Sequence, residues 1–373
     1  MSEQQTYSPG LAGVIAGETS IACVDQGKLL YRGYPIAELA EKTTFEEVAH
    51  LLLFGELPNA RQLASVKAAI EGYRALPGPV VDAIRQIPRD APMMDVCRSM
   101  VSYTGHFDPI SGHDADANRK RALWLTAQIA SIIAARFRTM NGKEPVDPKP
   151  GLSHAAQILY QCHGEEPTPL AAELIDLTLI LYAEHDFNAS TFTARVITST
   201  MSDIVSSITG AIGALKGPLH GGANEAAMEM LEQFKTKEEA AAWIKDALAN
   251  KKKVMGFGHR VYKHGDHRAT ILERKLRKLA HEKGQEHWMD IYDAIKEPME
   301  NQKKIYPNVD YPCGLTYYLL GLPLDLYTPL FVASRVTGWS AHVLEQNEDN
   351  RIYRPLSIYT GHAERSVPPM DER

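Results

Sequence analysis

Strand-forming sequence is confined to one short stretch of this chain, and this limits the fold more than any other feature. Two short strands are expected at residues 20–24 and 29–32, separated by the turn Asp25-Gln26-Gly27. From Thr44 onward the apolar residues recur at helical spacing instead. The sequence therefore predicts an all-α protein with one small β-hairpin near its N-terminus.

Capping residues indicate where several of the helices begin and end. Thr44 and Glu47 form a capping-box pattern, and Gly55 stands where a helix C-terminus is commonly closed. Asn59 can cap a second helix that runs to Ala75. Apolar periodicity predicts further helices at residues 118–139, 170–183, 191–212, 223–234, 237–250 and 327–344.

Composition argues against several kinds of partner. The 373 residues carry a formal net charge of −6 at pH 7, so the chain lacks the broad excess of cations that nucleic-acid binding requires. The longest apolar runs, such as residues 177–183, are too short to cross a bilayer. The four cysteines are scattered, which favours a reducing compartment, and residues 1–6 lack the pattern of a secretory signal. We therefore expect a cytoplasmic protein that binds neither nucleic acid nor membrane.

The glycine-rich stretch from Val254 to Arg268 is a candidate binding segment. Its glycines let the backbone approach a ligand closely, and His259 follows a Gly-Phe-Gly turn. This histidine can exchange a proton near neutral pH, and the planar guanidinium of Arg268 fits a carboxylate or a phosphate. Taken alone, the same residues also fit a solvated polar loop.

Arg335 lies inside a predicted core helix. Its neighbours include Phe331, Val332 and Trp339, so we expect the guanidinium to be drawn inward. An unpaired charge there would cost several kcal/mol. Arg335 therefore needs an anion, which could be a bound ligand or an internal acid such as Glu345.

Three further polar residues stand at breaks between helices. His220 precedes a predicted helix, whose positive end would keep the imidazole neutral and able to donate a hydrogen bond to a carbonyl oxygen. Simpler interpretations remain open, since His220 could be a packed loop residue, Asp310 a turn residue and His185 a buried residue at a helix end. Together, an aspartate base, histidines and arginines suit the removal of a proton next to a carbonyl while a carboxylate-bearing acceptor is held.

Several motifs together resemble the citrate synthase family, in the family's order and spacing. The N-terminal segments 10–13 and 31–35 and the segment 184–190 extend the similarity over nearly the whole chain. The motifs that carry the resemblance are Gly217-Pro218-Leu219-His220-Gly221-Gly222-Ala223-Asn224, Gly256-Phe257-Gly258-His259-Arg260-Val261-Tyr262-Lys263, Asn308-Val309-Asp310, Arg335 through Gly338-Trp339, and Arg354-Pro355.

The resemblance implies a catalytic role for three residues. Asp310 would remove a proton from the methyl group of acetyl-CoA, and His220 would stabilise the resulting enol or enolate. His259 would polarise the ketone of oxaloacetate and supply a proton as the new carbon–carbon bond forms. Hydrolysis of the citryl-CoA formed would release citrate and CoA.

The resemblance also implies how the substrates bind. His185, Arg268 and Arg335 would hold oxaloacetate, and Arg354 would reach the neighbouring active site across a homodimer interface. Arg351 competes with Arg354 for this last role, because the preceding loop varies in length among such enzymes.

Acetyl-CoA would be a co-substrate, and no tightly bound cofactor or metal is expected. Lys251 to Lys253 could attract the CoA phosphates, although a lysine run also fits a solvated face. The family commonly has Asp-Pro-Arg where this chain has Asp266-His267-Arg268, so His267 could add a titrating group beside the substrate. The backbone groups that would meet the adenine belong to Val254, Met255, Gly256, Phe257 and Gly258.

The architecture implied by the resemblance has two lobes. Residues 1–219 and 323–373 would form a large helical domain, and residues 220–322 a small one. Closure of the small domain would complete the site and exclude water. The chain is of the short kind that forms homodimers.

Three competing functions remain open. The nearest is 2-methylcitrate synthase, which uses propionyl-CoA with the same catalytic residues and differs in substrate by one methylene group. A metal-dependent hydrolase would use the histidines and Asp310 as ligands, although no pair has ligand spacing on one helix. The third is a non-catalytic helical binding protein.

Overall fold

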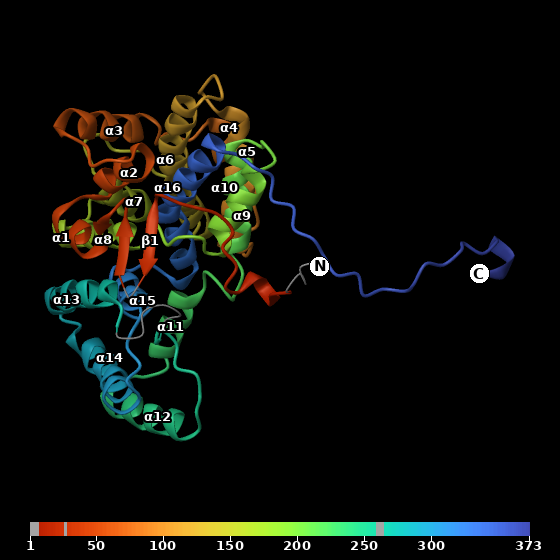
Figure 1. Cartoon of the computed structure of the whole chain (residues 1–373). Helices are drawn as coiled ribbons and strands as arrows, with labels where there is room; N and C mark the ends of the chain where they lie inside the picture. The colour runs from red at the N-terminus through yellow and green to blue at the C-terminus, as the bar shows by residue number, and fades with distance from the viewer. Residues whose placement is uncertain (1–6, 26–27, 259–264) are drawn as a thin grey trace.

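The computed structural model describes residues 7–25, 28–258 and 265–373, and shows a predominantly helical protein with one small sheet (Figure 1). His259 lies outside the described residues. The α-helices are α1 Ile36–Lys42, α2 Phe45–Phe54, α3 Ala60–Gly72, α4 Gly78–Gln86, α5 Met93–Thr104, α6 Ala115–Met140, α7 His154–His163, α8 Pro169–Tyr182, α9 Ala189–Thr198, α10 Ile204–Leu215, α11 Ala223–Leu231, α12 Lys237–Ala249, α13 His267–Glu282, α14 Glu286–Pro298, α15 Asp310–Leu319 and α16 Tyr327–Glu348. Short 3-10 segments occur at Pro9–Leu11, Gly105–Phe107, Leu324–Leu326 and Met370–Glu372, and a π-helical turn, η3, at Met299–Lys303.

The predicted hairpin is present and has a third short strand. β1 (Ala22–Asp25) and β2 (Lys28–Tyr31) pair antiparallel, and β3 (Tyr34–Pro35) pairs with the other edge of β2. Tyr31 is fully buried, and its hydroxyl donates to the carbonyl of Glu184 at 3.0 Å. The hairpin therefore fixes the backbone that follows α8, a segment that lines the cavity described below.

Helix capping in the N-terminal part follows the sequence closely. Thr44 and Glu47 form the predicted capping box of α2, and Gly55 closes that helix with a φ of 94°. Asn59 caps α3, whose backbone ends at Gly72, a few residues earlier than predicted. These local sequence signals therefore set the helix starts.

One predicted helix is wrong. Residues 191–212 form two helices, α9 and α10, rather than one. Met201 between them has a φ of 66°, and the side chain of Asp203 caps α10 by accepting from the Ser206 N–H at 2.9 Å. Apolar periodicity continues across the break because both helices bury a face against α16.

Two long helices organise the core. α6 and α16 pack against each other, and α16 also contacts α2, α8, α9 and α10. Nearly all of α16 is buried, including Trp339 and the guanidinium-bearing Arg335. A helix buried on all sides offers positions for polar side chains that point into an internal site.

The helices α11 to α14 gather at one end of the molecule, and the C-terminal residues extend away from its body (Figure 1). α12 packs on α14, and α15 contacts both α11 and α13. α13 also touches α8, which belongs to the main helical body. No helix in the described ranges is both long and apolar enough to cross a membrane.

Asp176 on α8 provides a test of the packing between α8 and α2. Its carboxylate accepts the Phe45 N–H at 3.1 Å, and burial, followed by the charge of Glu46, raises the pKa of Asp176 to about 7. Because the folded-state pKa lies above the unfolded value, stability is lost as pH rises from about 4 through about 7. Asn at this position keeps an acceptor for Phe45 without the charge. We expect D176N to unfold with about 2 kcal/mol more free energy than wild type at pH 8, after discounting for partial exposure.

The measurement is urea unfolding at pH 4.5 and pH 8. The advantage of D176N should vanish at the lower pH, while the exposed control Asp290→Asn should change little at either. A D176N protein less stable than wild type at pH 8 would contradict this expectation.

Candidate active site

A cavity of about 840 Å³ brings together most of the residues singled out from the sequence. Its walls come from the end of α8, the turn before α11, the loop before residue 259 and the first turns of α13 and α15, together with α16. The predicted residues that line it are His185, His220, Arg268, Asp310 and Arg335. Two arginines, two histidines and the carboxylate of Asp310 therefore share one site.

Asp310 is positioned by a backbone link between two loops. It is the first residue of α15, and its N–H donates to the side chain of Asn308 at 3.1 Å. Asn308 in turn donates through its own N–H to the Gly256 carbonyl at 2.9 Å and through Nδ2 to the Gly258 carbonyl at 3.0 Å. The Gly258 N–H donates to the Tyr306 carbonyl at 2.8 Å. The predicted CoA-binding loop and the predicted base are thus held as one unit.

The carboxylate of Asp310 accepts a hydrogen bond from the Tyr182 hydroxyl at 2.6 Å. Burial raises the pKa of Asp310 above its ordinary value, and the Tyr182 hydrogen bond and the charge of Arg268 offset part of this rise. Burial and the neighbouring Asp310 raise the pKa of Tyr182 well above its usual value, so the phenol stays protonated and donates. A carboxylate with a raised pKa is a stronger base than an exposed aspartate.

His220 is held as a neutral imidazole. Its Nε2 accepts the backbone N–H of Ser190 at 3.2 Å and lies 2.8 Å from the Ser190 hydroxyl. Because a backbone N–H only donates, Nε2 carries the lone pair and the proton lies on Nδ1. Burial, and then the charge of Arg335, lowers the pKa of His220 to about 4. The histidine lies in the turn before Gly222 and α11, so these causes replace the helix dipole expected from the sequence.

Arg335 points inward as predicted, with 2% of its surface exposed. Its Nε donates to the Tyr182 carbonyl at 2.6 Å, and its guanidinium lies over the Phe331 ring at 4.6 Å from the centroid. The salt bridge to Glu345 that the sequence left open is not formed, because Glu345 pairs with Arg195. Within the described residues, the guanidinium therefore lines the cavity without a hydrogen-bonded acid.

Arg268 is also buried but is already paired. Asp266 accepts from its Nε at 3.0 Å and from its Nη2 at 2.9 Å. The same carboxylate accepts the Val309 N–H at 3.1 Å, next to Asp310. Asp266 therefore ties the cavity-lining Arg268 of α13 to the start of α15.

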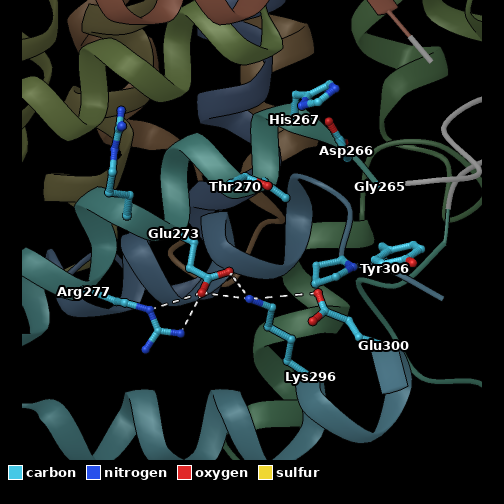
Figure 2. A pocket seen from close by; sticks show the side chains of 12 residues that line it. Gly265, Asp266, His267, Thr270, Glu273, Arg277, Lys296, Glu300 and Tyr306 are labelled. Atoms are coloured by element: carbon cyan, nitrogen blue, oxygen red, sulfur yellow. Dashed lines mark hydrogen bonds and ion pairs between the residues drawn. The ribbon is translucent and has the colours of Figure 1, made fainter. Parts of the chain in front are cut away.

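A second cavity, of about 410 Å³, lies beyond Asp266, and His267 lines this cavity rather than the first (Figure 2). Glu273 occupies its centre and accepts from Lys296 at 2.7 Å and from Arg277 at 2.6 Å. These charges neutralise one another, and the ion pair between Glu273 and Lys296 joins α13 to α14. His267 is exposed here and does not stand beside the candidate substrate site.

The remaining predicted binding residues are placed unevenly. Val254, Met255, Gly256, Phe257 and Gly258 all line the first cavity. Arg354 is exposed on the extended C-terminal segment and does not line the cavity of its own chain. Arg351 is exposed on the same segment. His259 cannot be placed, since it falls outside the described residues.

Three residues that shape the site escaped the sequence-based prediction: Tyr182, Ser190 and Asp266. Tyr182 is a polar side chain inside an apolar helical run, and Ser190 follows an Asn188 helix cap. Asp266 caps α13, which is what an aspartate in that position usually does. Only the last carried a local signal, and that signal pointed to capping rather than to Arg268.

The contacts of His220 and Asp310 bear on what the cavity can do chemically. In the described ranges, no group of three or more histidine, cysteine or acidic side chains is gathered closely enough to hold a metal ion. His220 and Asp310 instead contact Ser190 and Tyr182. A base and a neutral hydrogen-bond donor around a cavity with buried cations suit carbanion chemistry next to a carbonyl.

Comparison with known proteins places this chain in a family. The family model for the citrate synthase C-terminal domain matches residues 10–356. A 2-methylcitrate synthase 1 from Corynebacterium glutamicum is 45% identical over 100% of both chains, and a citrate synthase from Mycolicibacterium smegmatis is 43% identical over 98% of this chain and 97% of its own. The ternary complex of Thermoplasma acidophilum citrate synthase with carboxymethyl coenzyme A and oxaloacetate superposes with a TM-score of 0.90, at 35% identity, over 99% of this chain and 100% of that one. The resemblance and the helical fold predicted from the sequence are thereby confirmed, and the chain belongs to the citrate synthase family of condensing transferases.

Proposed function

We propose that this protein condenses acetyl-CoA with oxaloacetate and water to give citrate and CoA. The observation that carries the proposal is the pairing of Asp310, a buried carboxylate with a raised pKa, with the neutral His220 on one cavity. A base of this kind can remove a weakly acidic proton only if the charge that develops on the carbonyl oxygen is stabilised at once.

The first step follows from the protonation states of the two side chains. Asp310 takes a proton from the methyl group of the thioester, and the Nδ1–H of His220 donates to the thioester oxygen. The backbone N–H of Ser190 donates to Nε2 of His220, so Ser190 fixes the tautomer of His220 that this step requires. Tyr182 keeps Asp310 aligned through its hydroxyl.

The second step needs an electrophile held in place. Arg335, Arg268 and His185 line the cavity and would bind the two carboxylates of oxaloacetate. His259 is assigned to the ketone by family resemblance alone. Attack of the enolate carbon on the ketone gives citryl-CoA, and water then cleaves the thioester.

The CoA moiety would lie along residues 254–258. The carbonyls of Gly256 and Gly258 already accept from Asn308, and the Gly258 N–H donates to Tyr306, so these three backbone groups are already engaged. Lys252 pairs with Asp246 at 2.8 Å, whereas Lys253 lines the cavity. Of the two lysines, we therefore assign Lys253 to the CoA phosphates. A small domain of residues 220–322 that closes over the substrates is part of the same proposal.

The test is a thiol-release assay with oxaloacetate and either acetyl-CoA or propionyl-CoA. A higher kcat/KM with acetyl-CoA supports the proposal. Absence of thiol release with either thioester would overturn it.

Propionyl-CoA is the second candidate substrate, which would make the product 2-methylcitrate. It is favoured by the 45% identity to a relative named 2-methylcitrate synthase 1. One methylene group in an apolar pocket changes the barrier by about 1–3 kcal/mol, so the two activities can coexist in one enzyme. A kcat/KM ratio that favours propionyl-CoA would establish this alternative.

We further propose a cytoplasmic homodimer in which Arg354 enters the partner's site. The segment that carries Arg354 leaves the body of the chain (Figure 1) and exposes apolar side chains that a single chain leaves uncovered. These are Ile352, Leu356, Ile358, Tyr359 and Val367, each between 63% and 79% exposed.

Mixing two defective variants tests the contribution of Arg354. If it acts across the interface, R354A and D310N homodimers should each be nearly inactive. Heterodimers formed by co-expression should then contain one intact site and restore up to about one quarter of wild-type activity. Activity that is not restored would mean that Arg354 acts within its own chain. The same experiment with R351A distinguishes the two arginines, and the rate of thiol release is the readout.

A further inference from the structure

Arg335 is compensated differently from the other buried arginine of the site. Arg268 has a carboxylate in direct contact, since Asp266 accepts two of its N–H groups. Arg335 donates to a backbone carbonyl and stacks on a ring, and in the described part of the chain it forms no ion pair. A guanidinium with 2% exposure needs a negative charge nearby.

Glu184 is the acid placed to provide that charge. It is fully buried, and its Oε1 lies 3.0 Å from Nε2 of His342. Its Oε2 has no hydrogen-bond partner in the described parts of the chain. A Cβ at Gly338 would collide with this oxygen, so the carboxylate sits against α16 one turn beyond Arg335. Among the charged groups around Arg335, Glu184 does most to oppose the fall in its pKa that burial causes.

A chain of hydrogen bonds through His342 and Arg195 holds Glu184 in place. Ser20 donates to Glu345 at 2.7 Å, and Glu345 pairs with Arg195. The Nε–H of Arg195 donates to Nδ1 of His342 at 2.9 Å, so the other ring nitrogen carries the proton and donates to Glu184. In this chain of hydrogen bonds, the positive charge of Arg195 balances the negative charge of Glu345, and His342 is neutral.

We propose that Glu184 is a positioning residue that supplies the fixed counter-charge of Arg335, and that the chain through His342 and Arg195 keeps it there. The inference rests on the proposed function, in which Arg335 binds a carboxylate of oxaloacetate. Glu184 stabilises the empty site by neutralising the arginine. It also limits the affinity for the incoming anion, because the same negative charge repels a dicarboxylate.

The test removes the charge of Glu184 while keeping its shape. E184Q still accepts from Nε2 of His342 through the amide oxygen. We expect E184Q to melt at a lower temperature than wild type and to bind oxaloacetate roughly threefold to tenfold more tightly in isothermal titration. The KM for oxaloacetate should fall while the KM for the acyl-CoA stays unchanged. An equal or weaker affinity for oxaloacetate in folded E184Q would overturn the inference.

Glu46 offers a matched control. It is 2% exposed, accepts the His154 N–H at 2.9 Å through one oxygen, and does not line the cavity. Its other oxygen has no partner among the residues that the structure describes. E46Q should bind oxaloacetate as wild type does, whatever its effect on stability. A matching gain in affinity for E46Q would show that the effect is not specific to Glu184.

A double variant covers the case in which E184Q does not fold. If the two charges balance, the melting temperature of E184Q/R335Q should fall by less than the sum of the two single changes, and a folded double variant beside an unfolded E184Q satisfies this expectation. A double variant whose melting temperature falls by the full sum of the two single changes, or one that is unfolded beside an unfolded E184Q, would overturn the inference. Failure of the wild-type protein to bind oxaloacetate would instead remove the proposed function on which the inference rests.

Discussion

D310N should release thiol from acetyl-CoA about 1,000-fold more slowly than wild type, with little change in the affinity for oxaloacetate. Asn keeps the acceptor for the Tyr182 hydroxyl, so the side chain stays in place. It cannot take a proton from carbon, and in the described part of the chain Asp310 is the carboxylate that Tyr182 contacts. Arg335, Arg268 and His185 are untouched, so binding of the dicarboxylate should persist.

The stability of D310N should move in the opposite direction from its activity. Burial raises the pKa of Asp310, so its charge opposes folding at neutral pH. D310N should therefore melt at the same temperature as wild type or at a higher one, as is common when a functional charge is removed. The exposed control Asp325→Asn should change neither property. Activity of D310N within tenfold of wild type would show that another group is the base.

The pH dependence of the wild-type rate gives a second check on the base. The raised pKa means that Asp310 becomes protonated at a higher pH than an exposed aspartate does. As the pH is lowered, kcat should therefore begin to fall at a higher pH than it would with an ordinary carboxylate as the base. Y182F removes a hydrogen bond that favours the charged form, so it should move this decline to higher pH.

Local chemistry made several parts of the fold predictable. The capping box of Thr44 and Glu47 and the cap at Asn59 act within a few residues, so the sequence displays them directly. The inward orientation of Arg335 followed from its apolar neighbours alone. The same periodicity misled where α9 and α10 share a buried face, because a turn at Met201 leaves the apolar spacing intact.

Site features that join distant segments were not predictable in this way. The contact between Ser190 and His220, and that between Tyr182 and Asp310, span 30 and 128 residues. Neither Ser190 nor Tyr182 stands in a local sequence pattern that indicates its partner. Asp266 was visible only as a helix cap, although its contacts with Arg268 and Val309 give it a second role. Motif resemblance singled out the candidate reacting residues, whereas the structure shows which groups contact His220 and Asp310.

H220Q should lower kcat by about 100- to 1,000-fold, the usual effect of removing one donor to a developing oxyanion. Gln can still donate, but it lacks the ring geometry that the N–H and hydroxyl of Ser190 hold through Nε2. S190A should have a smaller effect, because the backbone N–H of residue 190 remains and keeps the proton of His220 on Nδ1.

The pH profile decides whether His220 acts as a neutral donor or as a cationic acid. With a pKa of about 4, His220 is already neutral at pH 6, so H220Q should lower the rate by the same factor at every pH from 6 to 9. The depressed pKa also means that His220 contributes stability above its unfolded value near 6.5, which is lost as pH falls towards about 4. Thiol release and thermal unfolding measured across this range test both statements. Loss of a titration near pH 6 to 7 in H220Q would show that the imidazole is charged in the working enzyme, and enolate stabilisation by a neutral donor would then have to be abandoned.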